Sequence, residues 1–453
     1  MFSIFGNSLS SGRIARLEAQ ALAAAEAGQE DEALRLLEPL RQAQGKQRAA
    51  AESLLRIVGG RHIGIEAGLA IFAEIAAAHG GDVDLLIELG ENAEAVRDLD
   101  DLNAPPPEHP LIRTLVDALT AIAETAAGRD REKALLRALA TSARLLARQG
   151  DAVAERCYRR LIEIDPENSA HRYNLGLFCK TRGRFAEGME ANRAAARLAG
   201  EAVESYEWNL GICATGCGDG AAALEVWKRM EQKIEMGRFG LPEGGYPQCK
   251  VKLAQRPLAE RTADTDDPGL EETIWIERLS PCHGVVRSVL FQDLGVDYGD
   301  VVLMDGAPIT YHKYGDQQVP VHPHLATLAR PGYRFFDFAG TQKQAGQLSD
   351  ISPELDRDAI VYSHTESFQT LCATCWRDPD IDHEHGEGEE KHVITGRIAA
   401  PPDMAPADLL ARIDKAIAAL GDCRLYAPDL CRAAGQTDRA ETEERRFRML
   451  KAN

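Results

Sequence analysis

The residues best suited to chemistry lie in one short stretch of the last quarter of the chain. Cys372 and Cys375 form a Cys-x-x-Cys pair, and His383-Glu384-His385 follows after seven intervening residues. Two thiolates three positions apart can share one tetrahedral ion, and a nearby pair of imidazoles can complete its coordination. The pattern predicts a site for zinc or another soft metal ion, with the ligands Cys372, Cys375, His383 and His385.

Two other interpretations of the cysteine pair stay open. A redox-active pair needs a helix N-terminus and a thioredoxin-like βαβ context, which the surrounding sequence does not indicate. Alternatively, both residues are thiols that only fill space in a core. Because His-x-His is not a standard closing spacing for zinc, the sequence alone does not choose among a metal site, a redox pair and buried thiols.

The segment around the two histidines is strongly acidic. Asp378 to Lys391 carries seven carboxylates and two histidines in fourteen residues, without an apolar period. This composition predicts a solvated flexible loop. Such a loop would attract cations and repel acidic partners.

A second set of histidines is scattered over the same half of the chain. If they converged on neighbouring strands, they could form a metal or acid–base centre. His322 and His324 would lie on the same side of an extended segment, although Pro323 favours an edge or a loop. The set, with two neighbouring polar residues, is His283, His312, His322, His324, His364, Cys282 and Glu366.

Several common catalytic motifs are absent from the sequence. There is no P-loop G-x-x-x-x-G-K-[ST], no H-E-x-x-H, no G-x-S-x-G and no G-x-G-x-x-G between a strand and a helix. Nucleotide chemistry and zincin-type proteolysis are therefore not expected.

Length and charge narrow the class further. The chain has 453 residues, 44% of them hydrophobic, with a formal net charge of -19, which is enough for two or three globular domains. The acidic balance argues against nucleic acid as a partner, since phosphate binding needs clustered Lys and Arg. No apolar run is long enough for a membrane span, and the first residues lack a secretory signal, so we expect a cytoplasmic protein with reduced thiols.

The composition changes near residue 240. Only six of the 21 prolines precede this point, whereas eight of the 12 histidines and six of the ten cysteines follow it. The first half has apolar residues every three or four positions and is predicted to be helical. We expect a weakly repetitive helical region at 1–104, helical repeats at 105–240, a linker or docking strap at 241–272, and a Cys/His-rich α+β domain at 273–453.

A fixed period supports the repeats. Tyr173 to Ala195 aligns with Trp208 to Met230 at an offset of 35 residues, which superimposes Gly176 on Gly211. A small residue at this position lets two helices of a repeat approach closely. The preceding block fits the same frame with Ala154, Tyr158, Leu161 and Pro166, and a weaker copy runs from Leu17 to Leu40 with Gly28 as its turn.

These features resemble the tetratricopeptide repeat family over roughly residues 135–235. The resemblance implies an α-solenoid whose concave groove binds a protein or peptide partner. In the family, groove residues lie on the first helix of each repeat. Here that position implies Tyr173, Leu177, Lys180, Trp208, Ile212 and Thr215, and the apolar Leu177 and Ile212 depart from the polar clamp that some members use for a C-terminal carboxylate.

The second half is predicted to carry strands first and helices afterwards. Short β-branched and aromatic runs bounded by Gly, Pro and Asp indicate strands near Ile274–Ile276, Tyr333–Phe338, Ala359–Ser363 and His392–Ile398. A helix at Pro406–Leu420 and a charged helix at Thr437–Lys451 follow. We therefore expect an α-solenoid joined to an α+β domain with a mixed or antiparallel sheet.

Three hypotheses about function follow from these elements. The first is an adaptor or accessory protein that binds a partner through its repeats and holds a metal in its second half. The second is a metal-dependent enzyme with its site in residues 273–400, to which the repeats deliver a peptide or protein. The third is a docking domain whose Cys-x-x-Cys pair only packs or holds structural zinc.

Overall fold

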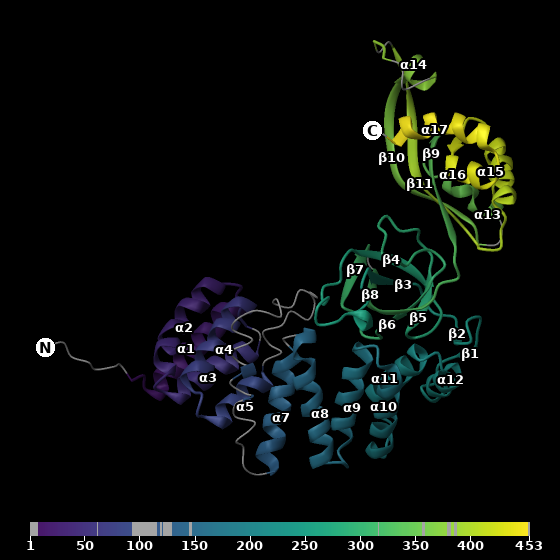
Figure 1. Ribbon diagram of the computed structural model, residues 1–453. Helices are drawn as coiled ribbons and strands as arrows, with labels where there is room; N and C mark the ends of the chain where they lie inside the picture. The colour runs from purple at the N-terminus through teal and green to yellow at the C-terminus, as the bar shows by residue number, and fades with distance from the viewer. Residues whose placement is uncertain are drawn as a thin grey trace. The chain divides into compact units, whose positions relative to one another are not determined.

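The computed structural model of the chain is shown in Figure 1. It describes residues 8–60, 62–92, 116–117, 120, 129–144, 147–315, 317–355, 358–377, 382–384 and 387–451. The chain forms two compact units, each built from discontinuous stretches. The first unit comprises Met1–Pro242, Leu258–Pro268 and Gly306–Pro320, and the second comprises Glu243–Pro257, Gly269–Asp305 and Val321–Asn453.

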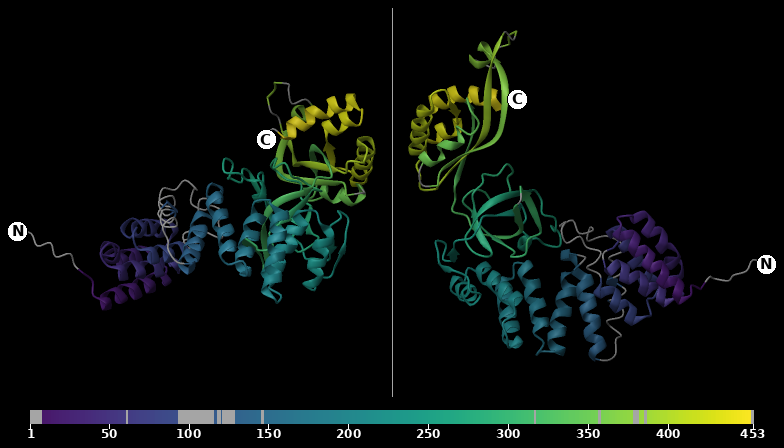
Figure 2. Two further views of the ribbon diagram at one scale, coloured as in Figure 1. Left: turned by 60° about the horizontal axis from the view of Figure 1, so that its bottom comes forward. Right: turned by 180° about the vertical axis from the view of Figure 1, so that it is seen from behind.

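The first unit is helical. Consecutive helices pack against each other, and Figure 2 shows α8 to α12 as a row from two further sides. The helices are α1 (Ser11–Glu26), α2 (Glu30–Gln44), α3 (Arg48–Gly59), α4 (Ile65–Ala78), α5 (Val83–Glu91), α7 (Arg129–Arg144), η2 (Ala147–Gly150), α8 (Asp151–Ile164), α9 (Ser169–Thr181), α10 (Phe185–Ala199), α11 (Glu204–Gly216) and α12 (Gly220–Arg229). The short strands β1 (Ile234–Met236) and β2 (Pro242–Gly244) follow.

Glycines in the turns set the hairpin pattern. Gly28, Gly183 and Gly218 lie between α1 and α2, α9 and α10, and α11 and α12, with φ of 72°, 69° and 73°. This left-handed conformation ends a helix at little cost only when the residue has no Cβ. Gly183 and Gly218 are 35 residues apart, so the turn repeats with the period that the sequence predicts.

Two further glycines allow each pair of helices to approach closely. Gly176 in α9 faces Asn192 of α10, and Gly211 in α11 faces the fully buried Trp227 of α12. A Cβ on Gly211 would lie 2.5 Å from Cζ2 of the Trp227 ring. The close approach that the sequence assigns to Gly176 and Gly211 is confirmed.

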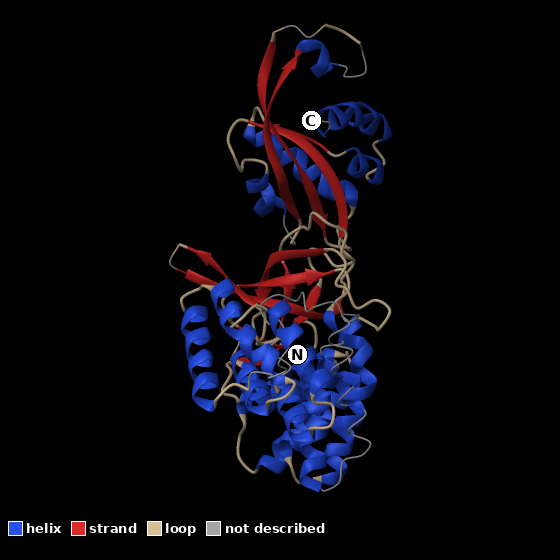
Figure 3. Ribbon diagram, turned by 90° about the vertical axis from the view of Figure 1, so that its left-hand side faces the viewer, coloured by secondary structure: helices blue, strands red, loops and turns tan. Residues whose placement is uncertain are grey.

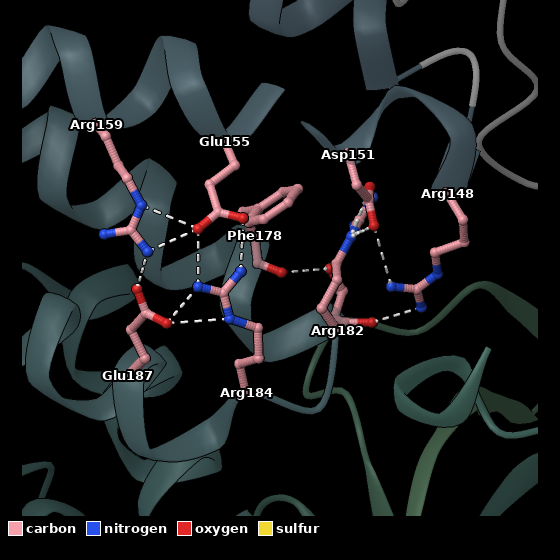
Figure 4. Close-up of polar contacts among 9 residues, drawn as sticks. Arg148, Asp151, Glu155, Arg159, Phe178, Arg182, Arg184 and Glu187 are labelled. Carbon is pink, nitrogen blue, oxygen red and sulfur yellow. Dashed lines mark hydrogen bonds and ion pairs between the residues drawn. The ribbon is translucent and has the colours of Figure 1, made fainter. Parts of the chain in front are cut away.

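Ion pairs join α8 to the turn between α9 and α10 (Figure 4). Glu155 accepts hydrogen bonds from Arg184 at 2.8 and 2.9 Å and from Arg159 at 2.9 and 2.6 Å. Asp151 accepts from Arg182 at 3.1 Å, and Arg148 lies 3.8 Å from the same carboxylate. The hydrogen bond from Arg184 lowers the pKa of Glu155 to about 2.

Arg148 also fixes a later segment to the helices of the first unit. Its guanidinium donates to the carbonyl oxygens of Thr181, at 2.8 Å, and of Leu258, and its backbone N–H donates to Asp266 at 2.8 Å. Burial lowers the pKa of Arg148 to about 10, so this arginine remains charged at neutral pH. The segment that contains η3 (Leu258–Glu260) is thereby held on the helices of the first unit.

A small barrel opens the second unit. Its strands are β3 (Cys249–Ala254), β4 (Glu271–Arg278), β5 (His283–Val286), β6 (Val301–Met304) and β8 (Gln317–Ala329), and β7 (Thr310–Tyr314) also pairs with β8. The barrel closes because β3 pairs antiparallel with β4 and parallel with β8, through Lys250 and Val321 among others. Closure removes the free edges, and Val251, Ile276 and Met304 fill the interior.

A four-stranded antiparallel sheet completes the second unit, with the order β10-β11-β9-β12. The long β10–β11 pair is seen in red in Figure 3. Helix α15 buries Leu409, Leu410 and Ile413 in the core of this domain. The elements are β9 (Arg334–Gln342), η4 (Ser349–Ile351), α13 (Ser352–Leu355), β10 (Ile360–Cys372), α14 (Ala373–Arg377), β11 (Gly388–Ala400), α15 (Pro406–Leu420), β12 (Arg424–Tyr426), α16 (Pro428–Ala433) and α17 (Thr437–Lys451).

The observed elements match the coarse prediction of a helical first half and a sheet-bearing second half. They differ at 241–272, where the sequence indicates a linker and the structure has β3 and the beginning of β4. The short Cys249–Ala254 strand lies among glycines and prolines, and its partners are distant in sequence. The predicted boundary at 104/105, in the proline segment, lies outside the described residues.

A glycine substitution tests the close helix approach. We expect Gly211→Ala to lower the free energy of unfolding by about 1–3 kcal/mol, because the buried Trp227 ring cannot move away from the added methyl group. Gly12→Ala is the matched control, since Gly12 lies in α1 and a methyl group added there would meet nothing within 4 Å. Urea denaturation of both variants checks this, and equal stabilities would contradict it.

A pH series tests the ion pairs around Glu155. Its folded pKa of about 2 lies below the ordinary 4.5, so its contribution to stability is full above about pH 4.5 and is lost as the pH falls towards 2. The difference in unfolding free energy between wild type and Glu155→Gln should therefore be largest at pH 6 and shrink below pH 4.5. Glu163→Gln, at an exposed i,i+3 pair on the same helix, should change little. A difference that does not vary with pH would refute the role of Glu155.

Candidate functional site

Three of the four predicted metal ligands lie together in the second unit. Nε2 of His383 is 3.1 Å from Sγ of Cys372 and 3.4 Å from Sγ of Cys375. The three ligand atoms all lie within 4.8 Å of one another, and in the described part of the chain no other group of three His, Cys, Asp or Glu residues does so. Zn–S bonds of about 2.3 Å and Zn–N bonds of about 2.0 Å in a tetrahedron separate S and N by roughly 3.5 Å. The observed separations fit one shared ion.

The ends of two strands position this group. Cys372 is the last residue of β10 and pairs with Gly388, the first residue of β11. Cys375 lies one helical turn further on, in α14, and its N–H donates to Sγ of Cys372 at 3.4 Å. The connection between the strands thus brings His383 back to the cysteines at the end of the β10–β11 pair.

Electrostatics bear on the redox interpretation. Partial desolvation and then the hydrogen bond with Cys372 raise the pKa of the Cys375 thiol. A nucleophilic redox cysteine needs the opposite shift, because only the thiolate reacts. The Cys375 thiol therefore lacks the activation of a nucleophilic thiolate.

The acidic segment is only partly the loop that the sequence predicts. Gly388 to Lys391 form the first residues of β11, since Thr370 and Gln369 of β10 pair with Glu390 and Lys391. Backbone pairing with a neighbouring strand overrides the polar composition here. Asp382 and Glu384 beside His383 are exposed. His385, the predicted fourth ligand, lies outside the described residues.

The scattered histidines occupy separate positions. In the barrel, Nδ1 of His283 lies 2.5 Å from Oγ of Ser280, and Nδ1 of His322 lies 2.9 Å from the carbonyl oxygen of Asp305. Both side chains are buried, as is His324, and burial lowers the pKa of His322. His364 stacks on Phe291 at 4.2 Å and its Nε2 lies 2.9 Å from the carbonyl oxygen of Val289.

These contacts give the histidines structural partners. His312 lies on β7, which belongs to the first unit. None of the five joins a group of three metal-ligating residues within the described ranges. The structure therefore does not gather them into the centre that the sequence left open.

The predicted groove residues lie on α9 and α11, which are side by side. Tyr173 stacks on Tyr206 at 4.7 Å, and Nζ of Lys180 donates to Oδ1 of Asn209 at 2.9 Å. Tyr173, Leu177 and Trp208 are half-buried, whereas Lys180 and Ile212 are only 2% and 1% exposed. Thr215 is fully buried and donates to the carbonyl oxygen of Gly211 at 2.8 Å.

A cavity that the sequence did not predict lies beside Trp208. It has a volume of about 540 Å³ and is formed by the beginning of α11 and the end of α12. The lining residues are Ala202, Glu204, Glu207, Trp208, Arg229, Met230, Glu231 and Gln232. The only signal for this cavity in the sequence was a set of three glutamates. Glu204 and Glu207 lie within four residues of Trp208, and Glu231 comes just after α12. An exposed acidic helix end gives the same pattern.

Fold and site together define a chain of helical hairpins followed by a barrel and an antiparallel α+β domain that carries a Cys₂His group. Among the described helices, none combines the length and the apolarity that a membrane crossing requires. No family model and no curated protein matches the chain.

Solved structures show a weak likeness. A crystal structure of MamA has a TM-score of 0.28 and 14% identity, covering 36% of this chain and 85% of that one. MamA AMB-1 has a TM-score of 0.28 and 14% identity, with 49% and 92% covered. The structure of Naa15/Naa10 bound to HypK-THB has a TM-score of 0.25 and 18% identity, with 48% and 36% covered. Likeness at this level establishes neither a family nor a function.

Proposed function

We propose that the chain is an adaptor that binds a protein or peptide partner on tetratricopeptide-like hairpins and holds a zinc ion in its C-terminal domain. The observation that carries the adaptor function is the repeated hairpin: α9–α10 and α11–α12 share the turn glycine and the close-contact glycine at the same spacing. Stacked hairpins of this kind present an extended surface along their first helices. A partner in extended or helical form suits such a surface.

Within this surface the predicted groove residues take different parts. Tyr173, Leu177 and Trp208 retain exposed area and would contact the partner. Lys180 and Ile212 are buried and would hold α9 and α11 in register from beneath, as the Lys180–Asn209 hydrogen bond does. Half-buried aromatic side chains on a rigid support are favourable contacts, because they lose little conformational entropy on binding.

Zinc is the ion that the C-terminal site suits best. Thiolate and imidazole donors in a tetrahedral arrangement favour zinc over the hard cations magnesium and calcium, which prefer oxygen ligands. Cys372, Cys375 and His383 supply three ligands, and we propose His385 as the fourth. One ion would tie the end of β10, α14 and the returning chain together, and so fix a connection of more than a dozen residues between Cys372 and Gly388.

Metal analysis tests the zinc site. We expect about one zinc per chain in the purified wild type, lost in Cys372→Ser and in His383→Ala, because removing one of three close ligands leaves an incomplete site. Cys217→Ser is the matched control, since Cys217 is an exposed thiol of α11's C-terminus. Wild-type protein without metal after zinc reconstitution, or variants that keep it, would exclude the site.

Peptide binding tests the adaptor function. Peptides selected from a random library on the full-length protein should bind Leu177→Ala and Tyr173→Ala at least about tenfold more weakly than wild type, as expected for central contact residues. Arg193→Ala, on the exposed face of α10, should bind as wild type does. Circular dichroism confirms that each variant is folded. Selected peptides that bind all variants equally would move recognition away from the repeats.

A further inference from the structure

The cavity beside Trp208 has the composition of a site for a cationic side chain. Its walls carry the carboxylates of Glu204, Glu207 and Glu231 against the single guanidinium of Arg229. Arg229 is already matched, because it donates to Glu207 at 2.7 Å and to Glu225 at 2.8 Å, and Glu225 is not part of the lining. The cavity therefore has a negative balance that a bound cation would offset.

The indole of Trp208 is held in place from several sides. Its Nε1–H donates to Oε1 of Glu204 at 3.2 Å, and its ring meets Trp227 edge-on with centroids 5.3 Å apart. The backbone of Gly306 packs against the six-membered ring, where a Cβ would lie 2.9 Å from Cε3. The indole is thus held at the cavity wall, and the exposed carboxylate of Glu204 is hydrogen-bonded to it.

Size and apolar lining indicate which kind of cation fits. A volume of about 540 Å³ lies within the usual range of small-ligand sites and admits a whole side chain. Ala202 and Met230 offer apolar contacts for a methylene stem, while the carboxylates meet a charged head. A guanidinium matches two carboxylates with its planar fork and is attracted to an indole, which favours arginine over a metal ion or a small amine.

The backbone at the cavity and the charge of the chain agree with this assignment. Glu231 has φ of 60°, a left-handed conformation that a residue with a Cβ rarely adopts, and it places this carboxylate just past the end of α12. The net charge of -19 attracts a basic partner over a longer range.

We infer that this cavity accepts an arginine side chain of the partner protein, held by Glu204 and Glu231 beside the Trp208 indole. This inference rests on the proposed adaptor function and gives its partner a chemistry: a basic segment whose arginine anchors at the last hairpin. The remainder of the segment would run along α11 and α9 towards Leu177 and Tyr173.

The cavity can be tested directly in the full-length protein labelled with 5-fluorotryptophan. The chain has four tryptophans, so fluorine NMR gives few resonances, and Trp208→Phe identifies that of Trp208. Titration with argininamide should shift the Trp208 resonance, whereas citrullinamide, its neutral isostere, should not. The Glu204→Gln/Glu231→Gln variant should weaken the argininamide response about tenfold, as loss of charge-assisted hydrogen bonds predicts. Glu190→Gln, a single carboxylate lost elsewhere in the solenoid, should leave it unchanged.

The possible outcomes distinguish a failure of the arginine site from a failure of the adaptor function. An equal response to citrullinamide, a full response in the double variant, or no response of Trp208 would overturn the arginine site. If selected peptides still lose binding with Leu177→Ala, the adaptor function survives that result. Enrichment of arginine in the selected peptides, together with an argininamide response that needs Glu204 and Glu231, supports the arginine site as well as the adaptor function.

Discussion

The close contact between paired helices is the constraint on which the proposed binding surface depends. Gly211 leaves room for the buried Trp227, and Trp227 in turn packs against Trp208 at the cavity wall. Gly176 plays the same part between α9 and α10, opposite Asn192. Helices α9 and α11 can therefore lie side by side, joined by the Tyr173–Tyr206 ring stack and the Lys180–Asn209 hydrogen bond. A larger residue at either glycine would separate the helices and disturb the side chains of the proposed binding surface.

In the C-terminal domain, the feature of interest is the connection between β10 and β11. Its two longest strands, β10 and β11, run to the connection that contains α14, where Ala373 is exposed and Thr374 and Cys375 are half-buried. The proposed metal ion, shared by Cys372, Cys375 and His383, would add to the packing of Cys375 against the apolar cluster around Leu371 and Met449. The exposed carboxylates of Asp382 and Glu384 beside His383 would raise the local attraction for the proposed cation.

An element could be predicted from the sequence when the contacts that form it are between residues close together in the chain. Helix bounds at Pro406–Leu420 and Thr437–Lys451 follow from caps and periodicity, and the 35-residue offset predicts the two hairpins α9–α10 and α11–α12. The Cys-x-x-Cys pair and His383 come together over a short connection. By contrast, Lys250 of β3 pairs with Val321 of β8, which lies some 70 residues further along the chain. Nothing local in the segment 241–272 predicts this pairing.

The same distinction explains the sites. Chemistry-bearing residue types drew attention to His283, His322 and His364, yet each has a hydrogen-bond partner that only the folded chain reveals. The sequence did not predict the acidic cavity, because the residues that line it form no recognisable pattern along the chain. Glu204 and Glu231 are ordinary surface residues in the sequence, and they line one cavity with Trp208 only because α11 and α12 bring them together.

Hydrogen–deuterium exchange of the full-length protein, with and without a selected peptide, tests the central claim most directly, because it reports where a partner slows backbone opening. We expect protection on peptide binding to be confined to α9, α11 and α12, with no change in β10 or β11. Protection in residues 273–453, with the helices unaffected, would contradict partner binding on the repeats.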